Sequence, residues 1–459
     1  MKRRNFIKLS IATCGALCLP TTISAARLNV GEIDFSHANY TSNAAQTIVV
    51  FLYGGASQLA GNLTNINEIK QKSQSSYDSY FRGITQTKNG FWKEAGGDAL
   101  EQLVDNGDMT LFRCCYSERR EREGNKAHGV CVSQNQRGSF DDNASGIMTN
   151  LAQIFQANNI VNENTLMPFV TMEGESQFYS DGSSPIPKYL KPVGIEENFE
   201  NPYKRNMLRR WFYYTDTERE SAPNNYWKDD KEGGFDPKLD KRIDALAQRV
   251  NKEGKIKSAF HKRVDLNTFI ASISALPTPD LGADAYPENN PFGEKLKGAI
   301  KILTRNPETK IVTIGTGGLG GWDDHNEGRD YVKRSEDLFI ALKSAMAHLK
   351  AVNKEQNVNI MVFGDFGRNV NLNSANGWDH GNLQNLYVLG GKGYFNHKGV
   401  VGETVIDANG QVNRLYLKPK SGSYQFEPLS IAATLYKIYG INNPQILTDN
   451  NGPIDQLLS

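Results

Sequence analysis

Short apolar runs recur along the chain, and longer amphipathic stretches fill the intervals between them. Six runs are rich in β-branched or aromatic residues and almost continuously apolar, which is typical of strands buried on both faces; they cover residues 47–53, 109–113, 168–172, 310–314, 360–363 and 386–389. Helical periodicity covers residues 239–250, 266–275, 292–303, 329–352 and 428–439. Strands that alternate with helices predict an α/β fold whose mostly parallel sheet is covered on both faces.

One long segment breaks this alternation. Residues 173–234 contain scattered prolines, the polar stretch Ser-Asp-Gly-Ser-Ser-Pro at 180–185, and many aromatic residues among charged ones. This pattern predicts an irregular excursion from the sheet. It is either a cap that faces a substrate or a covering of the surface, because long structured loops often carry function.

The N-terminus has the pattern of an export signal. Arg3 and Arg4 precede a short apolar run at 9–19 and the small residues at 24–26. We therefore predict that residues 1–26 are a twin-arginine signal peptide, and that the protein is exported folded to the periplasm or the exterior. A basic, unstructured N-terminal segment is the alternative, and the residues before Cys14 only weakly resemble the acylation site of a lipoprotein.

Composition and charge narrow the class of protein. Hydrophobic residues make up 39% of the 459, and the formal net charge is +1. Removing the four basic residues of the signal takes this charge to −3 over residues 27–459, which we expect to form a single domain. Neither a basic nucleic-acid surface nor a later transmembrane segment is predicted.

Three cysteines remain after the signal. In an oxidising compartment Cys131 could pair with Cys114 or Cys115, and three buried free thiols are the equally weighted alternative. None of them has the paired Cys-x-x-Cys spacing of a structural zinc site.

Metal-ligand chemistry clusters directly after one predicted strand. The stretch Gly317 to His325 reads Gly-Gly-Leu-Gly-Gly-Trp-Asp-Asp-His, so that Asp323, Asp324 and His325 follow a glycine-rich exit from the strand at 310–314. Carboxylate and imidazole ligands together suit zinc or a similar ion, whereas carboxylates alone favour calcium or magnesium. A solvated loop with local turn capping is the alternative.

A second unit repeats this arrangement. Asp365 follows the strand at 360–363, and Asp379 and His380 come after an asparagine-rich loop. Since open α/β sheets bind ligands at the carboxyl ends of their strands, we expect both units to form one site for one or two divalent ions. Arg368 either clamps an anionic ester through its guanidinium or forms a structural salt bridge.

With these motifs in hand, the chain resembles a known bacterial family. Phe-Leu-Tyr-Gly-Gly-Ala-Ser at 51–57, Gly-Trp-Asp-Asp-His, Asp-Phe-Gly-Arg and Gly-Trp-Asp-His, in this order after a twin-arginine start, resemble the domain-of-unknown-function 1501 family, which is related to alkaline phosphatases and sulfatases. The resemblance implies an alkaline-phosphatase-like three-layer sandwich that hydrolyses sulfate or phosphate esters. It also implies a divalent metal, with zinc favoured and calcium or manganese as alternatives.

The resemblance also assigns roles by position. Asp323, His325, Asp379 and His380 match the paired acidic and histidine motifs of the family, and Arg368 matches its arginine. His128 stands where members tend to carry a serine-histidine element, so it is a weaker candidate for the site.

The departures from the family pattern concern the chemistry. Ser57 stands where the family usually has an aspartate, and Gly381 replaces an aromatic residue, so one metal site is weakened or absent. Ser57 and Thr64 are the candidate nucleophiles, neither marked by a motif, and the Cys-x-Pro-x-Arg signature of formylglycine sulfatases is absent from the sequence.

Two functions follow from these observations. The first is an exported, metal-dependent hydrolase whose substrate is a small anionic ester or a sulfated or phosphorylated glycan. The second is a catalytically degenerate periplasmic binding or assembly protein that keeps the fold, with an unidentified protein partner. A purely structural metal is a further alternative.

Overall fold

The structure is a computed structural model that describes residues 28–73, 76–81, 83–182, 186–195, 245, 265–266, 268–316, 319–407 and 414–458. The predicted signal peptide with Cys14, most of the helix at 239–250, and the excursion from residue 196 onward lie outside the described residues.

One eight-stranded sheet forms the centre of the fold, in the order β4-β3-β5-β1-β6-β7-β2-β8. Its strands are β1 (Gln46–Leu52), β2 (Met109–Cys115), β3 (Phe169–Thr171), β4 (Val193–Gly194), β5 (Ile311–Ile314), β6 (Val358–Gly364), β7 (Gln384–Gly390) and β8 (Gly399–Val401). All of these pairings are parallel except the two that β7 makes with β6 and β2. A separate antiparallel pair joins β9 (Thr404–Ile406) to β10 (Leu417–Pro419).

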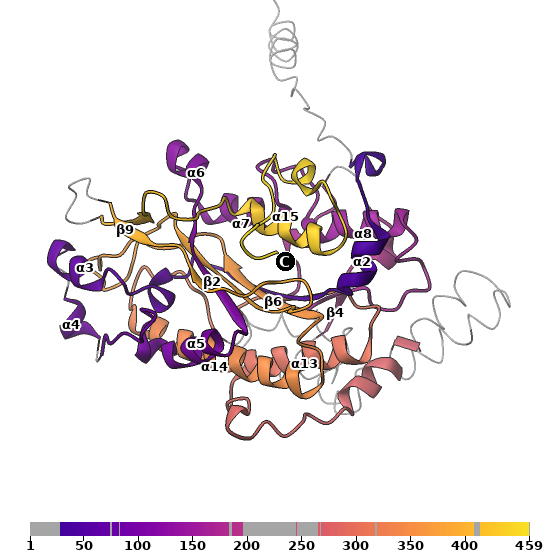
Figure 1. Cartoon of the computed structure of the whole chain (residues 1–459), viewed down its shortest axis with the longest axis horizontal. Coiled ribbons are helices and arrows are strands. Elements are labelled where there is room, and N and C mark those ends of the chain that lie inside the picture. The colour runs from indigo at the N-terminus through magenta and orange to yellow at the C-terminus, as the bar shows by residue number, and fades with distance from the viewer. Residues whose placement is uncertain are drawn as a thin grey trace, which may run out of the picture.

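Helices cover both faces of the sheet (Figure 1). One face carries α5 (Gly97–Asp105), α13 (Pro291–Arg305) and α14 (Arg329–Ala351), and the other carries α2 (His37–Asn43), α7 (His128–Arg137), α8 (Ile147–Ala157) and α15 (Leu429–Ile438). Shorter helices are α3 (Ile66–Ser73), α4 (Tyr77–Tyr80), α6 (Glu118–Glu123), η1 (Val30–Glu32), η2 (Gln58–Gly61), η3 (Lys93–Ala95), η4 (Gln177–Tyr179), η5 (Lys188–Leu190), η8 (Gly282–Asp284) and η9 (Pro444–Leu447).

The alternation of side chains along the strands explains the three layers. In β1, Ile48 and Val50 belong to the core on the α13–α14 side, whereas Val49 and Phe51 belong to the core on the α8–α15 side. All four are fully buried, because successive strand residues point to opposite faces and helices cover both. The predicted α/β class, with a mostly parallel sheet between two helical layers, is confirmed.

All six predicted strands are present, within two residues of the predicted ends. The helices predicted at 292–303, 329–352 and 428–439 correspond to α13, α14 and α15, and residues 268–274 are helical as well. The prediction missed β4 and β8 to β10, which have only two or three residues each. Because β4 pairs with β3, the first part of the predicted excursion returns to the edge of the sheet.

The direction of β7 decides where the site forms. In parallel strands such as β1, β5 and β6, the residues that follow the strand lie at the carboxyl edge of the sheet. The antiparallel β7 brings its amino end to this same edge, so the residues just before Gln384 join those that follow β6. This edge of the sheet therefore carries two kinds of site residue. Asp323 and Asp365 follow the parallel strands β5 and β6, and Asp379 and His380 precede the antiparallel β7.

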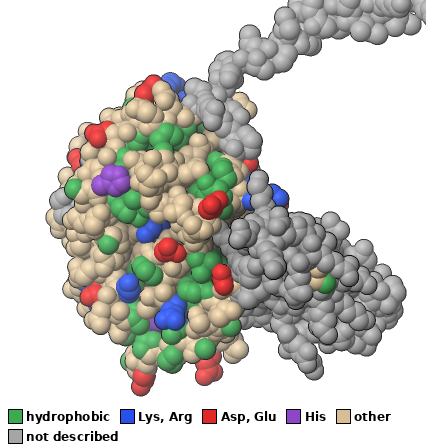
Figure 2. All heavy atoms as spheres, turned by 90° about the vertical axis from the view of Figure 1, so that its right-hand side faces the viewer, with side chains coloured by type: hydrophobic (Ala, Val, Ile, Leu, Met, Phe, Trp, Pro, Cys, Tyr) green, Lys and Arg blue, Asp and Glu red, His purple; other side chains and the backbone are tan. Residues whose placement is uncertain are grey.

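The three cysteines in the described part of the chain, Cys114, Cys115 and Cys131, are buried free thiols, so the disulfide alternative is not the one observed. Among the described residues, no helix is long and apolar enough to cross a membrane. On the face drawn in Figure 2, acidic and basic side chains are interspersed with apolar ones rather than gathered into a basic patch.

Candidate metal centre

His128 is the first residue of α7, and a buried carboxylate fixes its ring. Nδ1 of His128 lies 2.6 Å from Oδ2 of Asp365, which directly follows β6 and is fully buried. The other oxygen of Asp365 accepts hydrogen bonds from the backbone N–H groups of Gly55, at 2.8 Å, and Gly54, at 3.2 Å. An ionised carboxylate only accepts, so Nδ1 of His128 carries a proton and Nε2 is the ring nitrogen that is directed to another partner.

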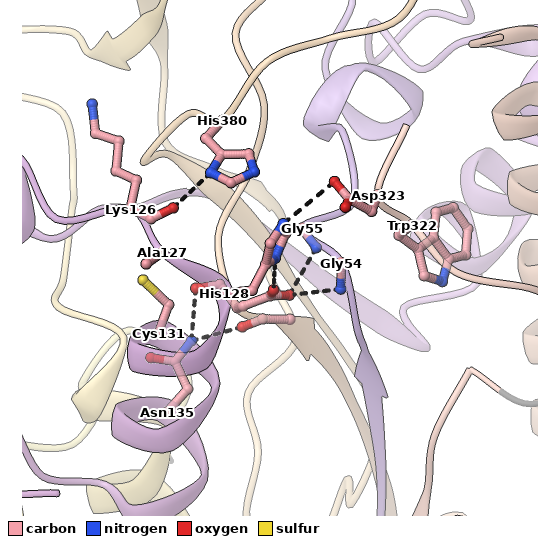
Figure 3. A network of polar contacts seen from close by, with 12 residues as sticks. Gly54, Gly55, Lys126, Ala127, His128, Cys131, Asn135, Trp322, Asp323 and His380 are labelled. Atoms are coloured by element: carbon pink, nitrogen blue, oxygen red, sulfur yellow. Dashed lines mark hydrogen bonds and ion pairs between the residues drawn. The ribbon is translucent and has the colours of Figure 1, made fainter. Parts of the chain in front are cut away.

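His380 has the same arrangement with a different acceptor. Its Nδ1 lies 2.7 Å from the backbone carbonyl oxygen of Lys126, two residues before α7 (Figure 3). Because a carbonyl oxygen only accepts, this contact places the ring proton on Nδ1. Among the described residues, Nε2 of His380 and Nε2 of His128 are buried without a hydrogen-bond partner.

His325 completes the set of three imidazoles. Its Nδ1 lies 3.3 Å from Oδ1 of Asp379, and the amide of Asn373 contacts the same carboxylate oxygen at 3.4 Å. Its Nε2 lies 3.2 Å from Oδ1 of Asp323 and 3.3 Å from Nη1 of Arg368. All three rings therefore direct Nδ1 to an oxygen of the protein, as metal-ligating histidines usually do.

Asp323 is the carboxylate that the imidazoles share. Its Oδ1 lies 3.3 Å from Nε2 of His128 and 3.2 Å from Nε2 of His325. One ligand atom each from His128, Asp323, His325 and His380 lie within 4.8 Å of one another, and no other such group of three or more His, Cys, Asp or Glu occurs in the described part of the chain. Figure 3 shows His128, Asp323 and His380 turned toward the same region.

Arg368 sits beside this group, but its donors are already used. Nε donates to the carbonyl of Gly55 at 2.7 Å and Nη1 to the carbonyl of Trp378 at 3.0 Å. Nη2 contacts the carbonyls of Gly54 and Trp322 and, at 2.5 Å, Oδ1 of Asp323. The side chain is fully buried, so its N–H groups hold three chain segments together instead of facing solvent.

The structure places three predicted ligands, Asp324, Asp365 and Asp379, outside the group of four. Asp324, next to Asp323, forms a buried ion pair with Arg334 of α14. Asp365 contacts the group only through His128, since its oxygens bind that ring and the two glycine N–H groups. Asp379 likewise contacts it through His325, with its own side chain 43% exposed.

Among the described residues, neither candidate nucleophile forms a hydrogen bond with an imidazole of the group. Ser57 is buried, and its hydroxyl accepts a hydrogen bond from the N–H of Leu59 at 3.4 Å as the cap of η2. The hydroxyl of Thr64 donates to the side chain of Asn62 at 2.8 Å.

Close backbone contacts hold the two sequence units together. The N–H of Trp378 donates to the carbonyl of Asp324 at 2.7 Å, and a Cβ on Gly377 would lie 2.3 Å from the backbone of His325. Gly54 has a φ of +108°, and a Cβ there would lie 2.5 Å from the backbone nitrogen of Asp323. Only glycine permits such approaches, so these residues bring residues 323–325 and 365–380 into one site.

The local charges shift the pKa values of three of the four side chains. The hydrogen bond to Asp365 raises the pKa of His128, against the opposing effect of burial. Burial, together with the Arg368 charge, lowers the pKa of His380, which keeps that ring neutral. Partial burial favours the neutral form of Asp323, but its hydrogen bond and charge interaction with Arg368 hold its pKa below the usual value.

Sequence reasoning missed the carbonyl of Lys126 and the amide of Asn373, which orient His380 and His325. The Lys126 carbonyl has no sequence signal, because every residue carries a backbone carbonyl. The signal that could have indicated Asn373 is the asparagine-rich loop in which it lies. Asn373 also accepts hydrogen bonds from the N–H groups of Ala375 and Gly377.

Comparison with known proteins gives distant structural matches. The crystal structure of Ps i-CgsB in complex with k-i-k-neocarrahexaose is 9% identical, with a TM-score of 0.37, over 89% of this chain and 74% of that chain. The phosphonate monoester hydrolase from Silicibacter pomeroyi is 13% identical, with a TM-score of 0.31, over 90% of this chain and 77% of that chain. No curated protein has a matching sequence. Residues 44–452 match a family described as "Protein of unknown function (DUF1501)", and the chain belongs to this family.

Proposed function

We propose that this chain binds one divalent metal ion through His128, Asp323, His325 and His380 and hydrolyses an anionic sulfate or phosphate ester there. The observation that carries the proposal is the common orientation of the three imidazoles, each of which gives Nδ1–H to an oxygen and presents Nε2 to the shared group. A single buried histidine is also usually hydrogen-bonded, so it is the convergence of three imidazoles and one carboxylate that indicates a ligand site.

The donor set suits zinc, or a similar transition ion, better than calcium or magnesium. Three imidazole nitrogens and one carboxylate oxygen match the ligands of zinc, whereas calcium and magnesium take oxygen. Ligand atoms around a tetrahedral ion with bonds of about 2.0–2.1 Å lie about 3.3 Å apart. The separations of Asp323 Oδ1 from His128 Nε2, 3.3 Å, and from His325 Nε2, 3.2 Å, match this value. The largest separation in the group, 4.8 Å, is wider, so the set is more open than a closed structural zinc site.

Exposure of the group favours a reactive site over a structural one. The side chains of His128, His325 and Asp323 are 31%, 38% and 52% exposed. Structural zinc sites are closed, whereas catalytic sites keep one position open to solvent or substrate. A substrate can therefore reach His325 and Asp323, the two most exposed of these three side chains.

Residues of the chain orient the metal ligands and bind the substrate anion. A divalent ion, when bound, supplies Lewis-acid polarisation of an ester oxygen. Asp365, Asp379 and the Lys126 carbonyl keep the ring protons on Nδ1, and Arg368 holds Asp323 in place. Since Arg368 has no N–H group to spare, the substrate anion is better received by the N-terminus of α7, where Ala127 makes no side-chain cap, next to His128.

A second function is favoured by the state of Ser57. Its buried hydroxyl caps η2, so an activated side-chain nucleophile at this position is not supported. A hydrolase then needs water as the attacking group. A degenerate periplasmic protein that binds the anion without turnover also fits these contacts.

Export by the twin-arginine pathway and action on a sulfated or phosphorylated glycan remain part of the proposal. The Arg3-Arg4 start supports the first, and the second extends the sulfate- or phosphate-ester hydrolysis that the resemblance of the motifs implies.

The test is a metal titration of residues 27–459 followed by an activity screen. We expect one zinc per chain by calorimetry, and at least a hundredfold weaker binding in His325→Ala, with His37→Ala as the matched control because His37 is exposed on α2. Turnover of aryl sulfates, aryl phosphates or sulfated glycans that is lost in His325→Ala supports the hydrolase. Metal binding without turnover supports the binding function, and no metal binding by the wild-type protein contradicts both.

A further inference from the structure

A small cavity is lined in part by Trp322 and Phe366, the chain neighbours of Asp323 and Asp365. It has a volume of about 20 Å³, and its lining includes Ala56, Ser57, Trp322, Tyr331, Asn385 and Tyr387. It lies between the turn that follows β1, α14 and the start of β7. Trp322 precedes Asp323, and Figure 3 shows the two side by side.

Three buried polar atoms of the lining residues lack a hydrogen-bond partner among the described residues. They are Nε1 of Trp322 and Nε2 of Gln384, both donors, and Oδ1 of Asn385, an acceptor. Trp322 is 1% exposed and Asn385 is 7% exposed. The amide of Asn385 cannot be turned around without loss, because Nδ2 donates to the carbonyl of Gln58 at 2.9 Å and to the hydroxyl of Tyr387 at 3.0 Å.

We propose that this cavity binds one water molecule, which accepts a hydrogen bond from the indole N–H of Trp322 and donates one to the side-chain carbonyl of Asn385. Buried polar groups are almost always hydrogen-bonded, and a buried site of roughly 10–15 Å³ or more holds one water when polar partners face it. A donor and an acceptor together select a neutral molecule that does both. An anion would face the Asn385 oxygen, a cation would face the indole N–H, and an apolar guest would satisfy neither.

The position of this water gives it a role in the site. The backbone of Trp322 is already held, since its N–H donates to the carbonyl of Tyr53 at 2.9 Å and its carbonyl accepts from Arg368 at 3.3 Å. The water ties the side chain to β7, so the residue that presents Asp323 is held at both ends. Trp322 is thus a positioning residue for Asp323; this role, unlike the water site itself, rests on the proposed metal binding.

The water site is tested on the wild-type protein. A high-resolution crystal structure is expected to show an ordered water within hydrogen-bond distance of both atoms. In ¹⁵N-tryptophan-labelled protein, the indole proton of Trp322, assigned by its loss in Trp322→Phe, is expected to show a cross-relaxation peak to water. A dry cavity, or a direct protein partner for this indole, overturns the proposal.

The positioning role is tested by zinc titration of Trp322→Phe beside Trp92→Phe. Trp92 is an equally buried control whose indole donates to the carbonyl of Gly83 at 3.1 Å. We expect several-fold weaker zinc binding in Trp322→Phe, and unchanged binding in Trp92→Phe at a similar loss of stability. Equal binding in both variants overturns the positioning role. Absence of zinc binding by the wild-type protein contradicts both the proposed function and the positioning role. The water site is then still decided by the crystal structure.

Discussion

The imidazole of His128 and the carboxylate of Asp365 are 2.6 Å apart from Nδ1 to Oδ2, the shortest contact that any imidazole of the candidate metal centre makes. The two residues come from different elements, the start of α7 and the end of β6, and are 237 positions apart. A fully buried aspartate thus sets which nitrogen of a half-buried histidine faces the site.

Replacing this aspartate by asparagine reverses the tautomer of His128. In Asp365→Asn, the side-chain oxygen can still accept hydrogen bonds from the N–H groups of Gly54 and Gly55. The amide nitrogen then faces Nδ1 of His128 and donates a hydrogen bond to it. The ring proton moves to Nε2, which can no longer bind a metal. We expect zinc affinity to fall by about 10- to 100-fold. Calorimetry measures the affinity, and ¹⁵N shifts of the ring nitrogens report the tautomer.

Asp379→Asn tests the corresponding contact with His325 and is compared with Asp365→Asn. Its contact with His325 is longer, 3.3 Å, and its side chain is 43% exposed, so water can replace the lost charge. We expect a smaller loss of zinc affinity than in Asp365→Asn. An equal or larger loss would contradict the view that burial and distance set the strength of these contacts.

The adjacent residues Asp323 and Asp324 make a second matched pair. Asp323→Asn removes the shared carboxylate and the counter-charge of the fully buried Arg368, so zinc affinity should fall at least tenfold, together with some stability. Asp324→Asn instead leaves Arg334 without its counter-charge, so the free energy of unfolding should fall by roughly 1–3 kcal/mol while zinc affinity stays unchanged. Urea unfolding and calorimetry on both variants separate the two effects. A loss of zinc affinity in Asp324→Asn, with unchanged affinity in Asp323→Asn, would show that Asp324 and not Asp323 is the metal ligand.

The sequence pattern placed the long strands and the helices α13, α14 and α15 correctly because their apolar periodicity matches their burial, but it did not predict α7 and α8. It also brought the correct regions to one edge, since residues after parallel strands share that edge. It could not choose between Asp323 and Asp324, because the choice depends on Arg334, ten positions further along the chain in α14. The antiparallel direction of β7 was equally invisible, because an apolar run carries no mark of its direction.

Arg368→Lys distinguishes the two interpretations of this arginine. Lysine has three donors on a single nitrogen, and it cannot reach the carbonyls of Gly54, Gly55 and Trp378 together. We expect the free energy of unfolding to fall by roughly 3 kcal/mol, with weaker zinc binding because Asp323 loses its support. An anion clamp predicts a different result: unchanged stability and a raised KM for anionic esters.

Glu173 lies away from the metal centre, beyond the end of β3. The hydroxyl of Tyr53 donates to its Oε2 at 2.9 Å, and Gln136 of α7 donates to the Tyr53 oxygen at 2.7 Å. Although the residue as a whole is half-buried, its Oε1 is shielded from solvent. Burial raises the pKa of Glu173 to about 7, and hydrogen bonds from Tyr53 and other neighbours offset this only in part.

This raised pKa predicts a loss of stability as the pH increases. Below the unfolded pKa, near 4.5, both states hold the proton and the contribution is fully present. Between that value and about 7 the unfolded chain ionises first, so the free energy of unfolding falls, by roughly 2–3 kcal/mol in all, and then levels off. Glu173→Gln should remove this loss, so the difference between wild type and variant isolates it from the contributions of all other ionisable groups. Urea unfolding at steps from pH 4.5 to 8.5 measures it, with the exposed Glu175→Gln as the control. A wild-type slope that persists in Glu173→Gln would show that this carboxylate is ionised in the folded protein throughout, and that its hydrogen bonds outweigh its burial.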